Sequence, residues 1–181
     1  MERELAVQAT TDALTGLPNR RRFEDVARDE IARGAQAGHP VVMAVMDLDL
    51  FKNINDNHGH AAGDAVLKAF GARLRETMRA RDLVCRFGGE EFAVLMPGTR
   101  AAQAHQALER LRSEVAAHPI LYNGASIPLT LSIGLAEGAG AEASLDRLLR
   151  AADAALYAAK VAGRNRICHA DGIRAARPAA R

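Results

Sequence analysis

The acidic residues of this sequence that could do chemistry gather at two places where apolar segments end. Asp47 and Asp49 close the run VVMAVMDLD, and Glu90 and Glu91 follow two glycines in RFGGEEF. An uncompensated carboxylate beside a buried strand is costly, so a positive partner is expected at both places. Mg²⁺ prefers carboxylate and carbonyl oxygens, so the two sites together favour metal-assisted phosphoryl transfer. Solvated loop residues are the plainer interpretation of the Asp-x-Asp pair.

A polar segment and a helix end supply further groups that could bind a nucleotide. The segment NINDNHGHAAGD spans residues 53–64. Its Asn and Asp side chains suit a guanine edge, because a carboxylate accepts from both N1–H and the exocyclic amine; they are also common turn formers. Lys160 and Arg164 stand at the end of the last expected helix, where cations suit the helix dipole and could equally bind a polyphosphate.

The composition is typical of one globular domain with a substantial core. The 181 residues are 49% hydrophobic and 25% charged, with a net charge of +2 that argues against nucleic acid as a bulk partner. The longest apolar run, PVVMAVM, is too short to cross a bilayer, and the charged MERE start shows no secretory signal. We therefore expect a cytoplasmic chain without membrane insertion. Neither Cys85 and Cys168 nor the six histidines show a metal-binding spacing.

The hydrophobic periodicity predicts four helices and five strands. The helices are expected at residues 20–33, 61–79 and 101–117, and from the Ser144 cap to about Gly163. The strands are expected in VVMAVMDLD, LVCRF, EFAVLM, ASIPLTLSIGLAE and residues 166–168. Gly88 and Gly89 predict a two-residue hairpin turn with positive φ. This order indicates an α/β (α+β) fold with a central mixed, largely antiparallel sheet flanked by helices.

Five fragments in order resemble one known family. They are DALTGLPNRR, DLDLFKNINDNHGHAAGD, RFGGEEF, LTLSIGLA and ADAALYAAKVAGRN, and they cover the chain from Asp12 to about Arg166. The sequence is similar to GGDEF domains, the diguanylate cyclase family, which condense two GTP into cyclic di-GMP and two pyrophosphates. The resemblance implies a palm-like nucleotidyl cyclase fold over residues 12–170. It also implies the end of a signalling or linker helix over residues 1–11, and residues 171–181 are expected to be a disordered tail.

The resemblance also implies roles for individual residues. Asp47, the Leu48 carbonyl and Glu90 correspond to the ligands of Mg²⁺, with Mn²⁺ an alternative. Glu90 replaces the Asp in the family name. Glu91 corresponds to a residue that assists metal binding or deprotonates the attacking hydroxyl, so Asp47, Glu90 and Glu91 are the catalytic candidates. The residues expected at GTP are Phe51, as a pocket wall, and Lys52, Asn55, Asp64, Gly88, Gly89, Lys160 and Arg164.

A regulatory site is implied by the segment RARD. Arg79 and Asp82 match the inhibitory site that binds the product in this family, and Arg110 matches its secondary arginine. The plainer interpretation is an Arg–Asp ion pair at a helix end. Because one domain binds one GTP, the resemblance further implies a catalytic homodimer and an upstream sensor or regulatory domain.

Two other functions compete with the cyclase. A catalytically silent domain that binds GTP or cyclic di-GMP as a receptor would usually lack the glutamates or the metal aspartate, and all are present here. A palm-type transferase acting on nucleic acid would be expected to carry a basic groove, which the sequence does not show.

Overall fold

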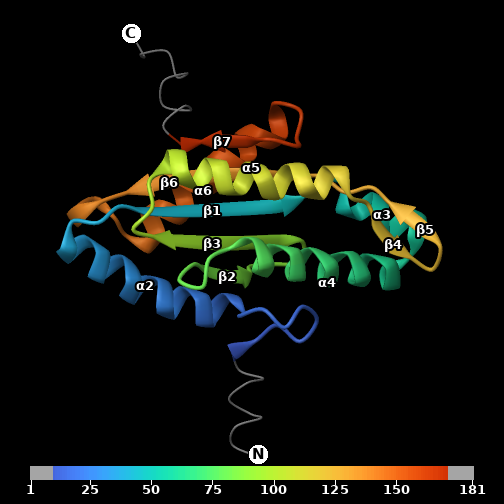
Figure 1. The fold of residues 1–181 in the computed structure, drawn as a ribbon, viewed down its shortest axis with the longest axis horizontal. Coiled ribbons are helices and arrows are strands. Elements are labelled where there is room, and N and C mark those ends of the chain that lie inside the picture. Colours follow the sequence, from blue (N-terminus) through green and yellow to red (C-terminus); the bar gives the residue numbers. More distant parts are fainter. Residues whose placement is uncertain (1–9, 171–181) are drawn as a thin grey trace, which may run out of the picture.

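The computed structural model describes residues 10–170, in which a five-stranded sheet carries helices on both faces (Figure 1). The linker helix expected over residues 1–11 lies outside this range except for its last two residues, and so does the expected tail. The helices are α2 (Arg20–Ala37), α3 (Phe51–His58), α4 (His60–Thr77), α5 (Ala101–Ala117), the 3-10 turn η1 (Gly140–Glu142) and α6 (Leu145–Val161). The strands are β1 (Val41–Leu48), β2 (Leu83–Arg86), β3 (Glu91–Pro97), β4 (Ile120–Tyr122), β5 (Ala125–Ile127), β6 (Leu131–Gly138) and β7 (Ile167–His169).

The central sheet has the order β2-β3-β1-β6-β7, with β7 at the top of Figure 1 and β2 at the bottom. Strand β1 lies in the middle and pairs antiparallel with both β3 and β6. Only β7 pairs in parallel, with β6, among the strands of this sheet that the structure describes. The expected mixed, largely antiparallel sheet is therefore confirmed.

Strand β1 is buried along its whole length because helices cover both of its faces. Its even-numbered residues from 42 to 48 join the apolar cluster that contains α4 and α5. The odd-numbered residues from 41 to 45 join the cluster that contains α2 and α6. Because side chains alternate along a strand, Asp47 belongs to the face covered by α2 and α6.

Two helices differ from the predicted ones. Residues 51–58, over which no helix was predicted, form α3, because Phe51 and Ile54 supply a short buried stripe among polar neighbours. Helix α2 continues past its predicted end at residue 33. Its end comes at Gly38, which adopts φ 70° and donates its N–H to the carbonyls of the last turn.

The β segments also differ from the prediction in two places. The turn between β2 and β3 is longer than two residues, and neither Gly88 nor Gly89 has a positive φ. Instead, the N–H groups of Phe87 and Gly88 both donate to the carbonyl of Glu91, at 2.7 and 3.1 Å. The segment ASIPLTLSIGLAE is two strands, because Pro128 lies between β5, which pairs with β4, and β6.

Substitution of Gly134 tests how closely α6 packs on the sheet. A methyl group added to Gly134 of β6 would lie 2.0 Å from the carbonyl oxygen of Ala152 and 2.2 Å from the nitrogen of Leu156. These are backbone atoms, so Gly134→Ala should lower the free energy of unfolding by about 1–3 kcal/mol or more in urea denaturation.

Gly34→Ala is the matched control. The nearest atom to its added methyl lies 3.7 Å away, and the residue is inside α2. Its free energy of unfolding should stay level or rise by about 0.5–1 kcal/mol. Equal stability of the two variants would contradict the close packing of α6 on β6.

Candidate active site

Asp47 is a buried carboxylate at the end of the central strand. Only 7% of the residue is exposed, and Lys160 of α6 donates a hydrogen bond from Nζ to Oδ2 at 2.6 Å. Burial raises the pKa of Asp47, the hydrogen bond from Lys160 lowers it, and the charge of Asp49 raises it; the pKa ends above its ordinary value. The single ammonium group therefore does not fully offset the cost of burying this charge.

The hairpin between β2 and β3 brings two more carboxylates to the same end of the sheet. Glu91 begins β3 and stands opposite Asp47 in the β1–β3 register. Its carboxylate lies over Gly88, where a side-chain methyl group would come within 2.9 Å of Oε2. Glu90 lies in the turn, and its carbonyl accepts the N–H of Leu48 at 3.2 Å. The end of β1 is thus tied directly to the acidic turn.

The electrostatics of Glu90 and Asp47 suit a divalent cation. Burial raises the pKa of Glu90, and the negative charge of Asp47 raises it further. No set of three or more His, Cys, Asp or Glu side chains forms a complete metal site in residues 10–170. Asp47, Glu90 and the Leu48 carbonyl offer oxygen atoms of the kind that Mg²⁺ prefers, so they are the candidate ligands for such an ion.

Asp49 has a different environment, although it lies only two residues from Asp47. Its carboxylate accepts the hydroxyls of Thr130 and Ser132, both at 2.7 Å, and the N–H of Asn165 at 3.0 Å. These contacts join the end of β1 to the start of β6 and to the loop after α6. Of the Asp-x-Asp pair, Asp49 is therefore a structural anchor and Asp47 is the candidate ligand.

The residues expected to read guanine lie where α3 packs on α4. Gly63 makes this approach possible, because a methyl group there would lie 1.9 Å from Oδ1 of Asn55 and 3.2 Å from Cζ of Phe51. Asp64, the next residue, is exposed, and so is Lys52 on α3, while Phe51 is buried. The fold thus places Asn55 beside the turn of α4 that carries Asp64.

The expected phosphate-binding cations lie on the α6 side of Asp47. Lys160 contacts its carboxylate directly, and the positive charge of Arg164 also lowers its pKa. Arg164 adopts φ 64° and donates its N–H to the carbonyl of Ala159 at 3.0 Å. Gly89, on the hairpin, has no atom within 4 Å of the position that a Cβ would take. The turn is therefore open at Gly89.

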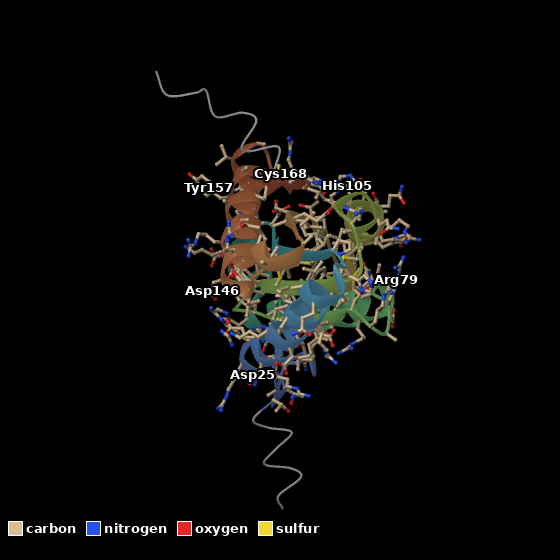
Figure 2. All side chains as sticks on the ribbon, turned by 90° about the vertical axis from the view of Figure 1, so that its left-hand side faces the viewer. Asp25, Arg79, His105, Asp146, Tyr157 and Cys168 are labelled. Atoms are coloured by element: carbon tan, nitrogen blue, oxygen red, sulfur yellow. The ribbon has the colours of Figure 1, made fainter. Side chains whose placement is uncertain are left out.

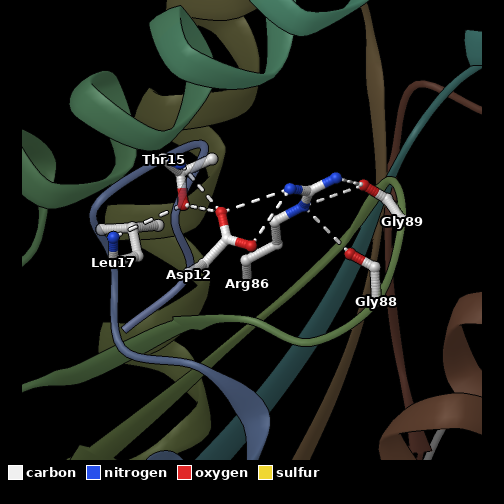
Figure 3. Close-up of polar contacts among 6 residues, drawn as sticks. All are labelled: Asp12, Thr15, Leu17, Arg86, Gly88 and Gly89. Atoms are coloured by element: carbon white, nitrogen blue, oxygen red, sulfur yellow. Dashed lines mark hydrogen bonds and ion pairs between the residues drawn. The ribbon is translucent and has the colours of Figure 1, made fainter. Parts of the chain in front are cut away.

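An arginine clamp that the sequence analysis did not identify holds the hairpin turn (Figure 3). Arg86 donates from Nε and Nη2 to the Gly89 carbonyl, at 3.0 and 2.7 Å, and from Nε to that of Gly88 at 3.2 Å. Its Nη1 pairs with both carboxylate oxygens of Asp12, at 3.2 and 3.1 Å. The signals in the sequence were Arg86 just before the glycines and Asp12 in DALTGLPNRR.

Asp12 is itself fixed by the turn that follows it. It accepts the N–H of Thr15 at 2.8 Å and the hydroxyl of Thr15 at 2.7 Å. Burial raises the pKa of Asp12, but the hydrogen bonds from Thr15 and Arg86 outweigh burial and hold the pKa below its ordinary value. The hairpin turn is also contacted by α2, because the Arg20 guanidinium lies 4.2 Å from the ring centre of Phe87 in that turn.

The residues expected to bind the product are arranged around α4. Asp82 is 4% exposed; its Oδ2 accepts the backbone N–H of Arg79 at 2.9 Å, and its Oδ1 has no hydrogen-bond partner among the described residues. In Figure 2, Arg79 lies on the side of the molecule opposite Tyr157, a residue of α6. Asp82 lines a cavity of about 230 Å³ against α2, whereas Arg110 lines another, of about 530 Å³, between α4 and α5. Asp82 and Arg110 thus line two different cavities.

Comparison with known proteins identifies the family to which the chain belongs. Residues 9–166 match the family described as diguanylate cyclase, GGDEF domain. Diguanylate cyclase DgcP of Pseudomonas aeruginosa is 46% identical over 160 residues, covering 88% of this chain and 24% of that protein. The response regulator PleD of Caulobacter vibrioides is 42% identical over 161 residues, covering 88% of this chain and 36% of that protein. The chain thus spans about a quarter to a third of the length of these relatives.

A solved structure extends the comparison to the fold. The GGDEF domain of DgcB from Caulobacter crescentus, in complex with c-di-GMP, superimposes with a TM-score of 0.85 at 36% identity. The match covers 90% of this chain and 96% of that domain, so the palm-like fold is confirmed. Within residues 10–170, no helix has the length and apolar character needed to cross a membrane.

The arginine clamp leads to a prediction about stability. Asp12→Ala leaves the guanidinium of Arg86, whose side chain is 16% exposed, without its anionic partner. We expect the free energy of unfolding at pH 7 to fall by about 1–3 kcal/mol in chemical denaturation. Asp29→Ala removes an exposed carboxylate from α2 and should change it by no more than about 0.5 kcal/mol.

The pH dependence of this loss of stability tests whether the charge of Asp12 causes it. Because the pKa of Asp12 is lowered in the folded protein, its contribution is present above the ordinary value of 3.8 and is lost as the pH falls through and below it. The difference between wild type and Asp12→Ala should therefore narrow below about pH 4. A difference that stays constant down to pH 2.5 would contradict an ionic role.

Proposed function

The chain belongs to the diguanylate cyclase family of GGDEF domains, and we propose that it condenses two molecules of GTP into cyclic di-GMP with release of two pyrophosphates. The observation that carries this proposal is the group formed by Asp47, Glu90 and Lys160. Lys160 donates to Asp47, both charges act on Glu90, and the pKa values of the two carboxyl groups are raised. This charge pattern suits a polyphosphate bound with a divalent cation.

The protein's own groups would orient one GTP. Asn55 and Asp64 would read the guanine edge, and a purine without the N1–H and amino donors would leave Asp64 unpaired. Lys160 and Arg164 would bind the phosphates, with Lys52 as a further contact. The turn is open at Gly89, where the triphosphate would approach the backbone closely.

Divalent metal is the cofactor on which this family depends, and we propose Mg²⁺, with Mn²⁺ as an alternative. Asp47, Glu90 and the Leu48 carbonyl would hold it. When bound, such an ion neutralises the negative charge that develops on the transferring phosphoryl group. Glu91, which lies over Gly88 and opposite Asp47, would assist metal binding or accept the proton of the attacking 3′-hydroxyl.

The reaction needs two domains. Each one holds a single GTP, so the 3′-hydroxyl that attacks must come from a nucleotide on a second copy, arranged antiparallel to the first. We therefore propose a catalytic homodimer, and a sensor or regulatory domain in the full-length protein that controls its formation. The cytoplasm, which supplies GTP, is the proposed location.

Product inhibition is the second part of the proposal. The unpaired Oδ1 of buried Asp82 supports it, because a ligand N–H would satisfy that oxygen. The guanidinium groups of Arg79 and Arg110 have no hydrogen bond or ion pair with other residues in the 10–170 range, so they are available for phosphate or for stacking on guanine.

The cyclase is tested by following cyclic di-GMP and pyrophosphate formation from GTP and Mg²⁺. Asp47→Asn and Glu90→Gln each remove one charge while keeping size, and each should lower kcat by about 100-fold or more. The control Asp29→Asn, on the exposed face of α2, should keep wild-type activity. Activity retained in Asp47→Asn or Glu90→Gln would refute the metal assignment. A wild type that binds GTP yet forms no product at high concentration would favour a receptor.

Inhibition is tested by adding cyclic di-GMP to the same assay. Arg79→Ala should raise the concentration that halves the rate by about 10-fold or more, because it removes a charged phosphate contact. Arg150→Ala, which removes an exposed arginine on α6, should not change that concentration. An identical inhibition curve for Arg79→Ala and wild type would contradict the inhibitory site and leave the segment RARD with a purely structural role.

A further inference from the structure

Two histidines that are 64 residues apart in sequence meet at the edge of the sheet. Nδ1 of His105 on α5 lies 2.8 Å from Nε2 of His169 on β7, and their ring centres are 5.0 Å apart with planes inclined by 31°. Figure 2 shows His105 beside the strand that carries Cys168. Both histidines are half-buried, so an ion in solvent can reach them. Neither belongs to the GTP, metal or product sites described above.

We propose that His105 and His169 form a two-imidazole site for a transition-metal ion of the Zn²⁺ class. Two imidazole nitrogens that bind one tetrahedral Zn²⁺ lie about 3.3 Å apart, given bond lengths of about 2.0–2.1 Å. The observed 2.8 Å separation is close to this distance, so small rotations of the two rings would admit the ion in place of the hydrogen-bonded proton. Water would complete the coordination.

The donor atoms distinguish this site from the Mg²⁺ site. Imidazole nitrogens suit Zn²⁺, Ni²⁺ and Cu²⁺, whereas Mg²⁺ prefers the oxygens at Asp47 and Glu90. Glu109, one turn after His105, is electrostatically coupled to it, although Arg112 already pairs with this carboxylate. Cys168 is not a ligand, because neighbouring side chains on β7 point to opposite faces. Among residues 10–170, the site therefore has two protein ligands, His105 and His169.

Occupancy of the site would link α5 to the edge of the sheet. Strand β7 pairs with β6 on one side, and α5 contacts it. Strand β7 follows directly after the loop that holds Arg164 and Asn165. Helix α5 also contacts that loop, because Arg112 donates to Oδ1 of Asn165 at 2.6 Å. A metal ion bound to both histidines would thus hold β7 close to the loop expected to bind phosphate.

Calorimetric titration of the untagged chain with ZnCl₂, in the presence of saturating MgCl₂, tests the proposal. Wild type should bind one Zn²⁺ per chain, and its melting temperature should rise with Zn²⁺ concentration. His105→Ala and His169→Ala should each weaken that binding by about 10-fold or more. His39→Ala, which removes an exposed histidine after α2, should bind Zn²⁺ as wild type does.

The measurement does not depend on cyclase activity, so its failure is distinct from failure of the proposed function. His105→Gln covers the case in which the alanine variant does not fold, since it keeps a hydrogen-bonding side chain of similar length. The proposal is overturned if wild type shows no saturable Zn²⁺ binding. Unchanged affinity in folded His105→Gln and His169→Ala would overturn it equally.

Discussion

A carboxylate at the buried end of β1 imposes the constraint on which the rest of the site depends. The strand is covered on both faces, so the charge of Asp47 is expensive unless positive groups and donors come to it. Lys160 reaches it from α6, and the backbone of its neighbour Leu48 binds the turn that carries Glu90. Segments that are far apart in sequence thus meet around one buried charge.

A second charged pair keeps the acidic turn in place. Arg86 holds the carbonyls of Gly88 and Gly89 on one side and the Asp12 carboxylate on the other. Two neighbouring contacts act with this clamp: the Arg86 N–H donates to the Pro18 carbonyl at 3.2 Å, and the Arg20 guanidinium lies over the Phe87 ring. The clamp therefore links the segment that precedes α2 to the residues proposed to bind metal and GTP.

The helices, caps and strands that depend on a local sequence pattern were predicted correctly. Helix α5, the Ser144 cap of α6 and the apolar strand β1 were predicted at the correct residues, because periodicity and caps depend on neighbouring residues. The helix over residues 51–58 was missed because only two of its residues are buried. The Arg86–Asp12 clamp and the histidine pair rest on contacts across 74 and 64 residues, for which a single sequence carries no distance information.

The dependence of the cyclase rate on protein concentration tests the central claim most directly. If two copies must each present one GTP, the rate of cyclic di-GMP formation per chain should rise with concentration at saturating GTP and Mg²⁺ and then level off as dimers form. A rate per chain that stays constant down to concentrations at which sedimentation shows only monomers would contradict the two-domain mechanism. Absence of cyclic di-GMP from a fully dimeric sample would contradict the cyclase itself.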